Sequence, residues 1–569
     1  MSNFKGIAGS DGVGIGKAVL IKEQDLSYES CSHLTVGEET KRFEDAVREF
    51  TEKTTAMADA MRDSVGEKES EILMGHVLMI SDPAMTDEVK GKIGEGMTSE
   101  AAAQEVFDMF AMIFESTDDE LTKQRATDIR DIKTRLIKIL RNVEEVDISS
   151  LPAGSVIVAN DLTPSMTAGI KKENVVGIIT EVGGRTSHSA ILARALEIPA
   201  VLSVSGVTGE LQDGQQVVVD GTGGNVISDP ETEQIEEYEI LKKKYDDEKK
   251  ELLKFIGKPT KTADGREVEL VCNIGKPGDC GAVIDCDGEG VGLFRTEFLY
   301  MDSPEAPDED EQFEAYKKVA MTMKGKPVII RTLDVGGDKD IPYMNLEKED
   351  NPFLGFRAVR YCVNNREFYS TQLRALLRAS AFGDIRIMVP LVTCVDEIRT
   401  VKAMVKSIMT DLDKEGIAYN KDIAVGVMIE TPAAAVAADL LAKEADFFSI
   451  GTNDLTGYTM AVDRGNAKVS YLYSAYNPAV IRSIKRVIEC GAAEGIMVGM
   501  CGEAAADPLM APLLISFGLN EYSVSPTSVL SARRTISQWT KAEADKAAEE
   551  ALACATEQEV REVLLRHKK

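Results

Sequence analysis

The sequence predicts a multidomain α/β protein: an α/β domain with an inserted all-helical subdomain, then a helical linker and a C-terminal (β/α)8 TIM barrel. Three observations lead to this fold class. The chain has 569 residues, of which 44% are hydrophobic, and this allows roughly two to four domains with separate cores. A helical stretch separates two groups of short apolar strands. From residue 260 onward, strand and helix patterns alternate over about 300 residues, as in a TIM barrel.

The first predicted domain combines residues 1–36 with residues 144–229. Residues 1–25 are glycine-rich and lead into the apolar segment 18–21. Because no strand precedes these glycines and no helix clearly follows them, they match neither a dinucleotide fingerprint nor a P-loop, and we expect a strand with turns. Further strands are expected at Ser155–Ala159, Val175–Ile179 and Gln216–Asp220.

The block 37–143 is predicted to be helical and to be inserted into that domain. Apolar residues recur at helical spacing, as at Phe43, Val47, Phe50, Met57 and Met61. Breaks at Pro83, Gly91 and 94–96 divide the block into about four helices, and Thr117–Glu120 fits a capping box. Its many methionines suit core packing or an adaptable docking surface.

The segment 230–260 is predicted to be a helical linker. Residues 230–257 are highly charged, and Glu239 with Lys243 forms a helix-supporting pair four residues apart. A run of charges is most often a solvated face, and nothing in this segment indicates another role.

The remaining residues, 261–569, form the predicted barrel. One further strand near Phe356–Tyr361 would bring the number of strands to eight. The other strand candidates are Val268–Ile274, Gly290–Arg295, Pro327–Arg331, Ile385–Leu391, Ala424–Glu430, Phe447–Gly451 and Met497–Cys501.

Composition narrows the possible partners and the compartment. The formal net charge of −30 disfavours binding to nucleic acid or to anionic membranes and would attract a basic protein. Acidity also serves solubility, and composition does not separate partner binding from solubility.

The nine cysteines form no Cys-x-x-Cys pair and no zinc-like cluster, which indicates reduced thiols in a cytoplasm. The start of the chain lacks the apolar core of a signal peptide, and no apolar run approaches the roughly 20 residues needed to span a bilayer. We therefore expect a cytoplasmic protein without membrane insertion.

His188 is the most informative residue of the chain. It follows Gly183 and Gly184, which allow a tight turn, and it stands at the start of a predicted helix, where free N–H groups and the dipole favour an anion. A neutral imidazole is a nucleophile that can carry a phosphoryl group. For an isolated histidine, a simple helix-capping role would be favoured by about three to one. The other histidines, His33, His76 and His567, lack such a turn.

A second group of chemical residues lies at the ends of the predicted barrel strands, where TIM-barrel active sites are found. Arginines bind phosphate and carboxylate in a bidentate manner, and the two carboxylates Glu430 and Asp454 suit Mg²⁺. Thr431 and Pro432 predict a helix that starts directly after Glu430. The strand ends carry Arg295, Arg331, Glu430, Asn453, Asp454, Cys501 and Glu503.

Both groups resemble motifs of the phosphoenolpyruvate-utilising enzymes. Gly183–Ser189 resembles their phosphohistidine motif, and its Arg-Thr-Ser-His form is similar to enzyme I of the bacterial sugar phosphotransferase system. The resemblance extends over essentially the whole chain, because the order and spacing of the barrel motifs match as well. The matching barrel stretches are 292–297, 331–334, 338–339, 351–357, 430–432, 451–456, 463–465 and 499–503.

The resemblance implies a role for each matching residue. His188 would accept the phosphoryl group of phosphoenolpyruvate, and Cys501 would protonate the enolate to give pyruvate. Because a thiol is mostly protonated at neutral pH, Cys501 can act as an acid. Glu430 and Asp454 would bind the cofactor Mg²⁺. The substrate would be held by Arg295, Arg331, Asn453, Arg464 and Arg357, and His188 would be supported by Thr167 and Arg194.

The resemblance also implies partners and an activity. The family transfers the phosphoryl group onward to the phosphocarrier protein HPr, which binds a helical subdomain, and its barrel forms a homodimer. The chain departs from the family pattern at Gly457, where a larger polar residue is expected, and at Ala506, where glycine is expected. Neither change removes a catalytic group.

Two other functions were weighed. Pyruvate phosphate dikinase and phosphoenolpyruvate synthase share the histidine and barrel domains but need an ATP-binding domain of about 200–300 residues, and the first 150 residues are too short and too helical to supply it. A non-catalytic sensor of phosphoenolpyruvate is disfavoured because His188, Cys501, Glu430 and Asp454 are all present.

Overall fold

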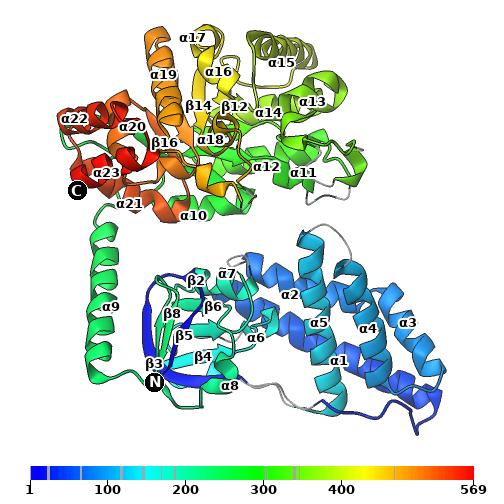
Figure 1. The fold of residues 1–569 in the computed structure, drawn as a ribbon. Coiled ribbons are helices and arrows are strands. Elements are labelled where there is room, and N and C mark those ends of the chain that lie inside the picture. The colour runs from blue at the N-terminus through cyan, green and yellow to red at the C-terminus, as the bar shows by residue number, and fades with distance from the viewer. Residues whose placement is uncertain are drawn as a thin grey trace. The chain divides into compact units, whose positions relative to one another are not determined.

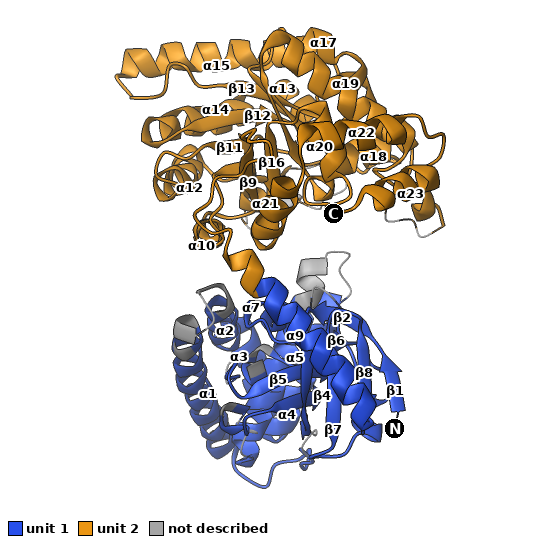
Figure 2. Cartoon of the chain, turned by 90° about the vertical axis from the view of Figure 1, so that its left-hand side faces the viewer, with its two compact units in different colours: residues 1–249 blue, residues 250–569 orange. Residues whose placement is uncertain are grey.

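The computed structural model divides the chain into two compact units, residues 1–249 and 250–569 (Figure 2). It describes residues 2–21, 26–64, 67–115, 120–143, 148–167, 170–184, 187–301, 303, 305–336, 341–344, 346–464, 466 and 468–569. The division between the units falls within helix α9 (Thr232–Leu253), which buries none of its side chains. This helix agrees with the predicted linker; the finer domain boundaries given by the sequence remain predictions.

The first unit contains an eight-stranded mixed sheet in the order β1-β8-β7-β3-β4-β5-β6-β2 (Figure 1). Strands β3 to β6 run parallel, and the outer strands pair antiparallel. Long apolar runs in β4 and β5 are buried on both faces, as parallel strands require. The strands are β1 (Ser2–Lys5), β2 (Ile7–Ser10), β3 (Val13–Ile21), β4 (Ser155–Ala159), β5 (Val175–Thr180), β6 (Ala200–Leu202), β7 (Gln216–Asp220) and β8 (Asn225–Ser228).

Helices α1 to α5 lie between β3 and β4 in the chain and have a core of their own around Phe43, Phe50 and Phe107 (Figure 1). The predicted helical insertion is therefore present. The described residues form five helices rather than about four, and Gly91 lies inside α3 because its backbone continues the helix. The first three residues of the predicted capping box, 117–119, lie outside the described residues. The helices are α1 (Val36–Ser64), α2 (Glu67–Ile80), α3 (Pro83–Gly94), α4 (Ser99–Glu115) and α5 (Glu120–Arg141).

Three short helices follow strands of the sheet: α6 (Pro164–Thr167), α7 (His188–Ala195) and α8 (Val207–Glu210). Helix α6 comes after β4, and α7 comes after β5. Because β4 and β5 are parallel neighbours, the two helices begin near the same edge of the sheet.

The second unit is a closed barrel of eight parallel strands, and seven of them were predicted. The prediction of a strand near residues 356–361 was wrong, because α13 begins at Ala358. The eighth strand is instead β16, which has four residues and carries two polar side chains, Glu521 and Ser523; it therefore lacks the apolar run that identifies a buried strand. The strands are β9 (Glu269–Ile274), β10 (Val291–Arg295), β11 (Val328–Arg331), β12 (Ile385–Val389), β13 (Val425–Ile429), β14 (Phe447–Gly451), β15 (Met497–Cys501) and β16 (Glu521–Val524).

The barrel is surrounded by helices. They are α10 (Cys280–Asp285), α11 (Glu297–Met301), α12 (Glu309–Thr322), α13 (Ala358–Asn364), α14 (Arg366–Ala379), α15 (Val395–Glu415), α16 (Pro432–Val436), α17 (Ala438–Leu441), α18 (Thr452–Met460), α19 (Pro478–Glu494), α20 (Ala511–Phe517), α21 (Val529–Gln538), α22 (Lys541–Leu552) and α23 (Glu557–His567). In the part of the chain that the structure describes, none of the helices has the length and apolarity of a membrane span.

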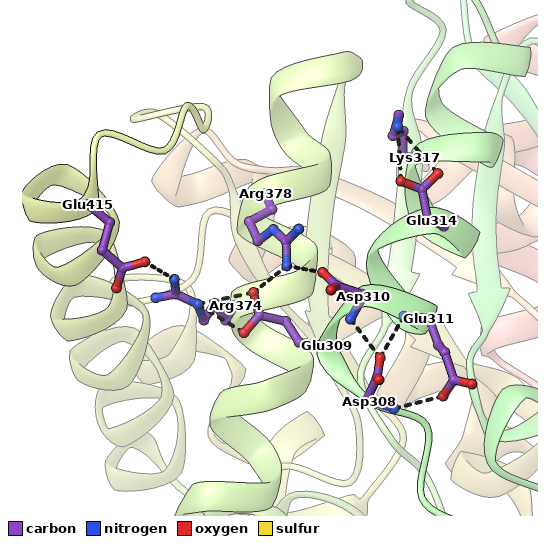
Figure 3. A network of polar contacts seen from close by, with 9 residues as sticks. All are labelled: Asp308, Glu309, Asp310, Glu311, Glu314, Lys317, Arg374, Arg378 and Glu415. Atoms are coloured by element: carbon purple, nitrogen blue, oxygen red, sulfur yellow. Dashed lines mark hydrogen bonds and ion pairs between the residues drawn. The ribbon is translucent and has the colours of Figure 1, made fainter.

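An ion-pair network joins three of these outer helices (Figure 3). Arg374 of α14 lies 2.9 Å from Glu309 of α12 and also contacts Glu415 of α15. Arg378, one turn further along α14, pairs with Glu309 at 2.5 Å and with Asp310 at 2.7 Å. Arg374, Arg378 and Glu309 are partly buried, whereas Asp310 and Glu415 are exposed. Because the charges share partners, the network holds α12, α14 and α15 together more firmly than isolated surface pairs would.

Candidate functional site

His188 occupies the first turn of α7, as predicted. The helix is capped by Ser187, whose hydroxyl accepts a hydrogen bond from the Ala190 amide at 3.3 Å. Gly183 has a φ of +107° and a Cβ there would lie 3.1 Å from the Ser187 hydroxyl, so the turn requires glycine. Arg185 and Thr186, which complete the sequence motif, lie outside the described residues.

The imidazole of His188 is partly buried. Its Nδ1 is buried and has no hydrogen-bond partner among the described residues. Burial raises the pKa of Asp161, and the nearby His188 opposes that shift, so a carboxyl group lies close to the histidine. Sequence reasoning missed Asp161. Its position gave the signal, because it follows β4 by two residues and the ends of β4 and β5 meet at one edge.

The structure describes the side chain of only one of the two residues predicted to support His188. Thr167 is the last residue of α6, and its side chain lies outside the described part of the structure. Ser165 of the same helix donates a hydrogen bond to Asp131 of α5 at 2.9 Å, which ties α6 to the helical insertion. Arg194 is six residues beyond His188, about 9 Å along the helix axis, and its guanidinium donates to the Gly9 carbonyl at 2.9 Å. Both supporting roles stay predictions.

In the barrel unit, the structure brings buried arginines and carboxylates together at the carboxyl ends of the strands. Arg331 lies 2.7 Å from Glu297 and 2.9 Å from Asp334, and Arg357 lies 2.9 Å from the other oxygen of Asp334. Asp334 therefore orients two of the predicted substrate-binding arginines. Sequence reasoning did not assign Glu297 or Asp334 to the site, although both lie within the motif stretches.

Glu430 and Asp454 are the two carboxylates predicted to bind the metal, a role that stays a prediction. Burial raises the pKa of Glu430 well above its usual range, and Asp334 and Asp454 raise it further. The pKa of Asp454 is raised by burial and then by Asp334. One oxygen of Glu430 accepts the Leu391 amide at 2.6 Å. A Cβ at Gly451 would lie 2.9 Å from the other oxygen, so the glycine makes room for this carboxylate.

The donor set fits Mg²⁺. Carboxylates held so close that they raise one another's pKa are stabilised by a cation between them. The described residues contain no group of three or more His, Cys, Asp and Glu side chains arranged for a metal ion. Mg²⁺ commonly takes only one or two protein carboxylates and completes its octahedral shell with water and substrate oxygens, so Glu430 and Asp454 are sufficient.

Of the other predicted substrate-binding residues, Arg295 ends β10, Asn453 lies in α18 and Arg464 follows α18. Arg295 is exposed and pairs in register with Arg331 on the next strand. The Asn453 carbonyl accepts the Tyr473 hydroxyl at 3.0 Å. Arg464 is exposed and lies close enough to oppose the raised pKa of Asp454. The motif residues 338–339 and 465 lie outside the described residues.

Cys501 ends β15 and is buried. The Ser449 hydroxyl donates to its sulfur at 3.4 Å, and the thiol donates to the Ile450 carbonyl at 3.8 Å. Burial raises the pKa of Cys501 to about 12, so the thiol holds its proton at neutral pH more firmly than an exposed cysteine. Ser449 was not predicted from the sequence, because its role depends on contact with the neighbouring strand.

Glu521 lies inside the barrel at the start of β16. Its side chain is fully buried, and neither carboxyl oxygen has a hydrogen-bond partner among the residues that the structure describes. Burial, with a smaller contribution from Glu269 and against the opposing effect of Arg386, raises the pKa of Glu521 to about 8. A Cβ at Gly499 would lie 2.5 Å from one Glu521 oxygen, so this strand leaves space for the carboxyl group.

Family models of known proteins match segments in both compact units of the chain. Three family models match: the PEP-utilising enzyme N-terminal domain over residues 5–125, the mobile domain over residues 151–224 and the PEP-binding domain over residues 249–541.

Relatives match over nearly the full length. The phosphoenolpyruvate-protein phosphotransferase of Bacillus subtilis (strain 168) is 47% identical over 561 residues, which cover 98% of each chain. The proteins of the same name from Staphylococcus epidermidis and Listeria innocua are 46% and 47% identical, and each match covers 98% of the relative. The chain therefore belongs to the phosphoenolpyruvate-protein phosphotransferase family of the PEP-utilising enzymes.

Proposed function

We propose that this chain is a phosphoenolpyruvate-protein phosphotransferase that phosphorylates itself on His188, releases pyruvate and passes the phosphoryl group to the phosphocarrier protein HPr, which starts sugar uptake. The observation that carries this proposal is the pairing of two sites in one chain. One unit presents a histidine at a glycine turn, and the other gathers arginines, carboxylates and a protonated thiol at the mouth of a barrel. The full-length relatives support it.

The barrel residues would bind phosphoenolpyruvate through its two anionic groups. Arg295, Arg331 and Arg464 would hold its phosphate and carboxylate, because guanidinium groups match both in geometry and charge. Arg357 and Asn453 would position the phosphate further. The ion pairs of Asp334 keep Arg331 and Arg357 from adopting other rotamers before the substrate arrives. Mg²⁺, when held by Glu430 and Asp454, would neutralise charge on the transferring phosphoryl group.

Cys501 would supply the proton of the reaction. As the bond between phosphorus and the enolate oxygen breaks, an imidazole nitrogen of His188 forms the new bond to phosphorus in line. The thiol then gives its proton to the methylene carbon of the enolate, which yields pyruvate, and the thiolate regains a proton from solvent. Because burial raises the pKa of Cys501 to about 12, the thiol is in its acidic form throughout the neutral range.

His188 would carry the phosphoryl group. Since Nδ1 is buried, we assign the phosphoryl group to Nε2, and Thr167 would hydrogen-bond the ring. Arg194 would contact the phosphoryl group once its present contact with Gly9 is released. The histidine and the barrel residues belong to different compact units, so a rotation about the segment 230–260 would bring them together. A linker stiffened by proline or shortened by one helical turn should slow autophosphorylation; unchanged kinetics would contradict the rotation.

The proposed partners each have a supporting surface. On the helical insertion, Leu78, Met109, Met112 and Ile113 are exposed, which suits docking of HPr. On loops of the barrel, Phe353, Leu354, Phe356, Tyr471 and Leu472 are exposed, which suits a homodimer. All nine cysteines are free, which supports the proposed location in a reducing cytoplasm.

Incubation with phosphoenolpyruvate labelled in its phosphate, with Mg²⁺ present, tests the function. The expected product is an acid-labile, base-stable label that is absent in His188→Ala and present in His33→Ala, a matched control at an exposed histidine. Addition of HPr should then remove the label from the chain. A chain that binds phosphoenolpyruvate but never becomes labelled would instead be a sensor, and the proposal would fail.

A further inference from the structure

Two cysteines that take no part in the proposed reaction lie in contact at the base of the barrel unit. Cys272 is buried in β9, and Cys286 directly follows α10 and is partly exposed. Their sulfur atoms are 3.9 Å apart. A disulfide has a sulfur–sulfur length of about 2.05 Å, so a closer approach of roughly 2 Å would join them.

The two thiols differ in solvent exposure and in the direction in which their pKa values are shifted. The contact with Cys272, in which either sulfur can be the donor, lowers the pKa of Cys286, and the cation Arg533 also lowers it. As a thiol, Cys286 donates to the Val283 carbonyl at 3.4 Å. The pKa of Cys272 is raised by the contact with Cys286 and by burial. Because Cys286 is partly exposed and Cys272 is buried, an oxidant from solvent reaches the Cys286 sulfur first.

Cys286 lies outside regular structure, and the next residue, Asp287, has a φ of +61°, which costs energy in a non-glycine residue. Cys280, the first residue of the preceding helix α10, differs in both respects, because it belongs to the helix and burial raises its pKa to about 11. It therefore serves as an internal control.

We propose that Cys272 and Cys286 form a reversible redox pair that a peroxide-class oxidant converts to an intramolecular disulfide. The Cys286 thiolate attacks one oxygen of hydrogen peroxide, becomes a sulfenic acid and releases hydroxide, which takes up a proton to give water. The Cys272 thiol then attacks the Cys286 sulfur, forms the sulfur–sulfur bond and releases a second water. The two electrons lost by the sulfurs reduce the peroxide, and a dithiol reductant returns both thiols.

The pair lies beside the point where the linker meets the barrel. The Asp287 carboxylate accepts hydrogen bonds from the Gly257 amide at 2.7 Å and from Arg533 at 2.6 Å, and Arg533 also donates to the Phe255 carbonyl at 2.9 Å. Because Asp287 is the residue after Cys286, a disulfide that draws Cys286 towards β9 displaces this anchor. Oxidation is thus expected to loosen residues 255–257.

Peptide mapping of the full chain tests the pair directly and independently of its activity. The chain carries Cys31→Ser and Cys394→Ser, which remove two exposed thiols, and is treated with hydrogen peroxide, alkylated with N-ethylmaleimide and cleaved before aspartate. Cleavage at positions 264, 279, 285 and 287 places Cys272, Cys280 and Cys286 on separate peptides. The expected product is peptide 264–278 linked to peptide 285–286, about 2 Da lighter than the two thiols, and lost on treatment with dithiothreitol. Alkylation of both peptides, or a link to Cys280 instead, would overturn the proposal.

Single variants test the order of events. In Cys272→Ser, Cys286 should accumulate as a sulfenic acid that dimedone traps, whereas in Cys286→Ser, Cys272 should stay reduced. Cys280→Ser should form the disulfide as the parent chain does. Hydrogen exchange then tests the anchor: the amides of residues 255–257 should exchange at least about tenfold faster after oxidation, and equal exchange before and after would refute the displacement of Asp287.

Discussion

Replacement of Glu521 by glutamine should stabilise the barrel unit at alkaline pH and leave its stability almost unchanged in acid. The carboxyl group of Glu521 is fully buried without a hydrogen-bond partner among the described residues. Ionisation in such a site is opposed by the loss of hydration. Glutamine has the size of the protonated acid and no charge, so the variant retains the packing and removes the titration.

The structure supplies the sign and the size of the effect. The pKa of Glu521 is raised from the ordinary 4.5 to about 8 in the folded chain. A group with a raised folded pKa contributes stability that is present below the unfolded pKa and is lost as pH rises through the folded pKa. At about 1.4 kcal/mol for each pH unit of that interval, the wild type loses about 5 kcal/mol relative to the glutamine variant between pH 4.5 and pH 8.

Urea unfolding at several pH values measures this difference. The chain has a single tryptophan, Trp539, which is buried in the barrel unit, so its fluorescence reports the unfolding of that unit. The difference in unfolding free energy between Glu521→Gln and the wild type should be near zero below about pH 4, about 1 kcal/mol at about pH 5 and about 5 kcal/mol at about pH 9. Titrating groups that do not interact with Glu521 cancel in this difference. If the unfolding free energies of the two proteins change with pH by the same amount, the reasoning is refuted.

A neighbouring variant provides the control. Glu269 raises the pKa of Glu521 by repulsion, so Glu269→Gln should move the loss of stability to lower pH without abolishing it. If Glu269→Gln instead removes the pH dependence as completely as Glu521→Gln does, the titrating group has been misassigned.

Three further predictions follow from the site and the fold. Asp334→Asn should free Arg331 and Arg357 and raise the KM for phosphoenolpyruvate about tenfold or more, because a hydrogen bond to a charged group contributes about 1.5–3 kcal/mol; an unchanged KM in steady-state assays would contradict the ion-pair arrangement. Arg374→Met should lower the unfolding free energy of the barrel unit by about 1 kcal/mol in the same urea experiment, while the rate of phosphorylation stays constant. Asp454→Asn should raise the Mg²⁺ concentration for half-maximal labelling at least about tenfold, and a titration that overlays the wild type would remove it from the proposed ligands.

Much of the barrel could be predicted because parallel strands are buried on both faces and appear as apolar runs. Phe447–Gly451 and Met497–Cys501 were predicted with the bounds that the structure has. Strand β16 could not be recognised, because Glu521 directs a polar side chain into the interior and breaks the pattern. The carboxyl group is accommodated by the empty space at Gly499 on the neighbouring strand, and a local pattern does not reveal such a space.

In the candidate site, too, a local sequence pattern identified some residues and not those that depend on neighbouring segments. Residues with chemistry of their own, such as Glu430 and Cys501, could be found from residue type and position at strand ends. Residues that act through another side chain could not. Asp334 matters because it contacts two arginines from different segments, and Ser449 matters because its strand is paired with the strand of Cys501. These relationships exist only once the strands are assembled.

Gly451 illustrates how a missing side chain can belong to an active site. Glu430 occupies the volume that a methyl group at position 451 would fill, and the same glycine is the last residue before helix α18, which presents Asn453 and Asp454. Because its side chain is only a hydrogen atom, Gly451 leaves space for the Glu430 carboxylate and also precedes the helix that carries Asn453 and Asp454. Any larger residue would push the Glu430 carboxylate away from Asp454, which follows the neighbouring strand β14. The tolerance of the site to mutation is thus limited by an empty volume as strictly as by its charged groups.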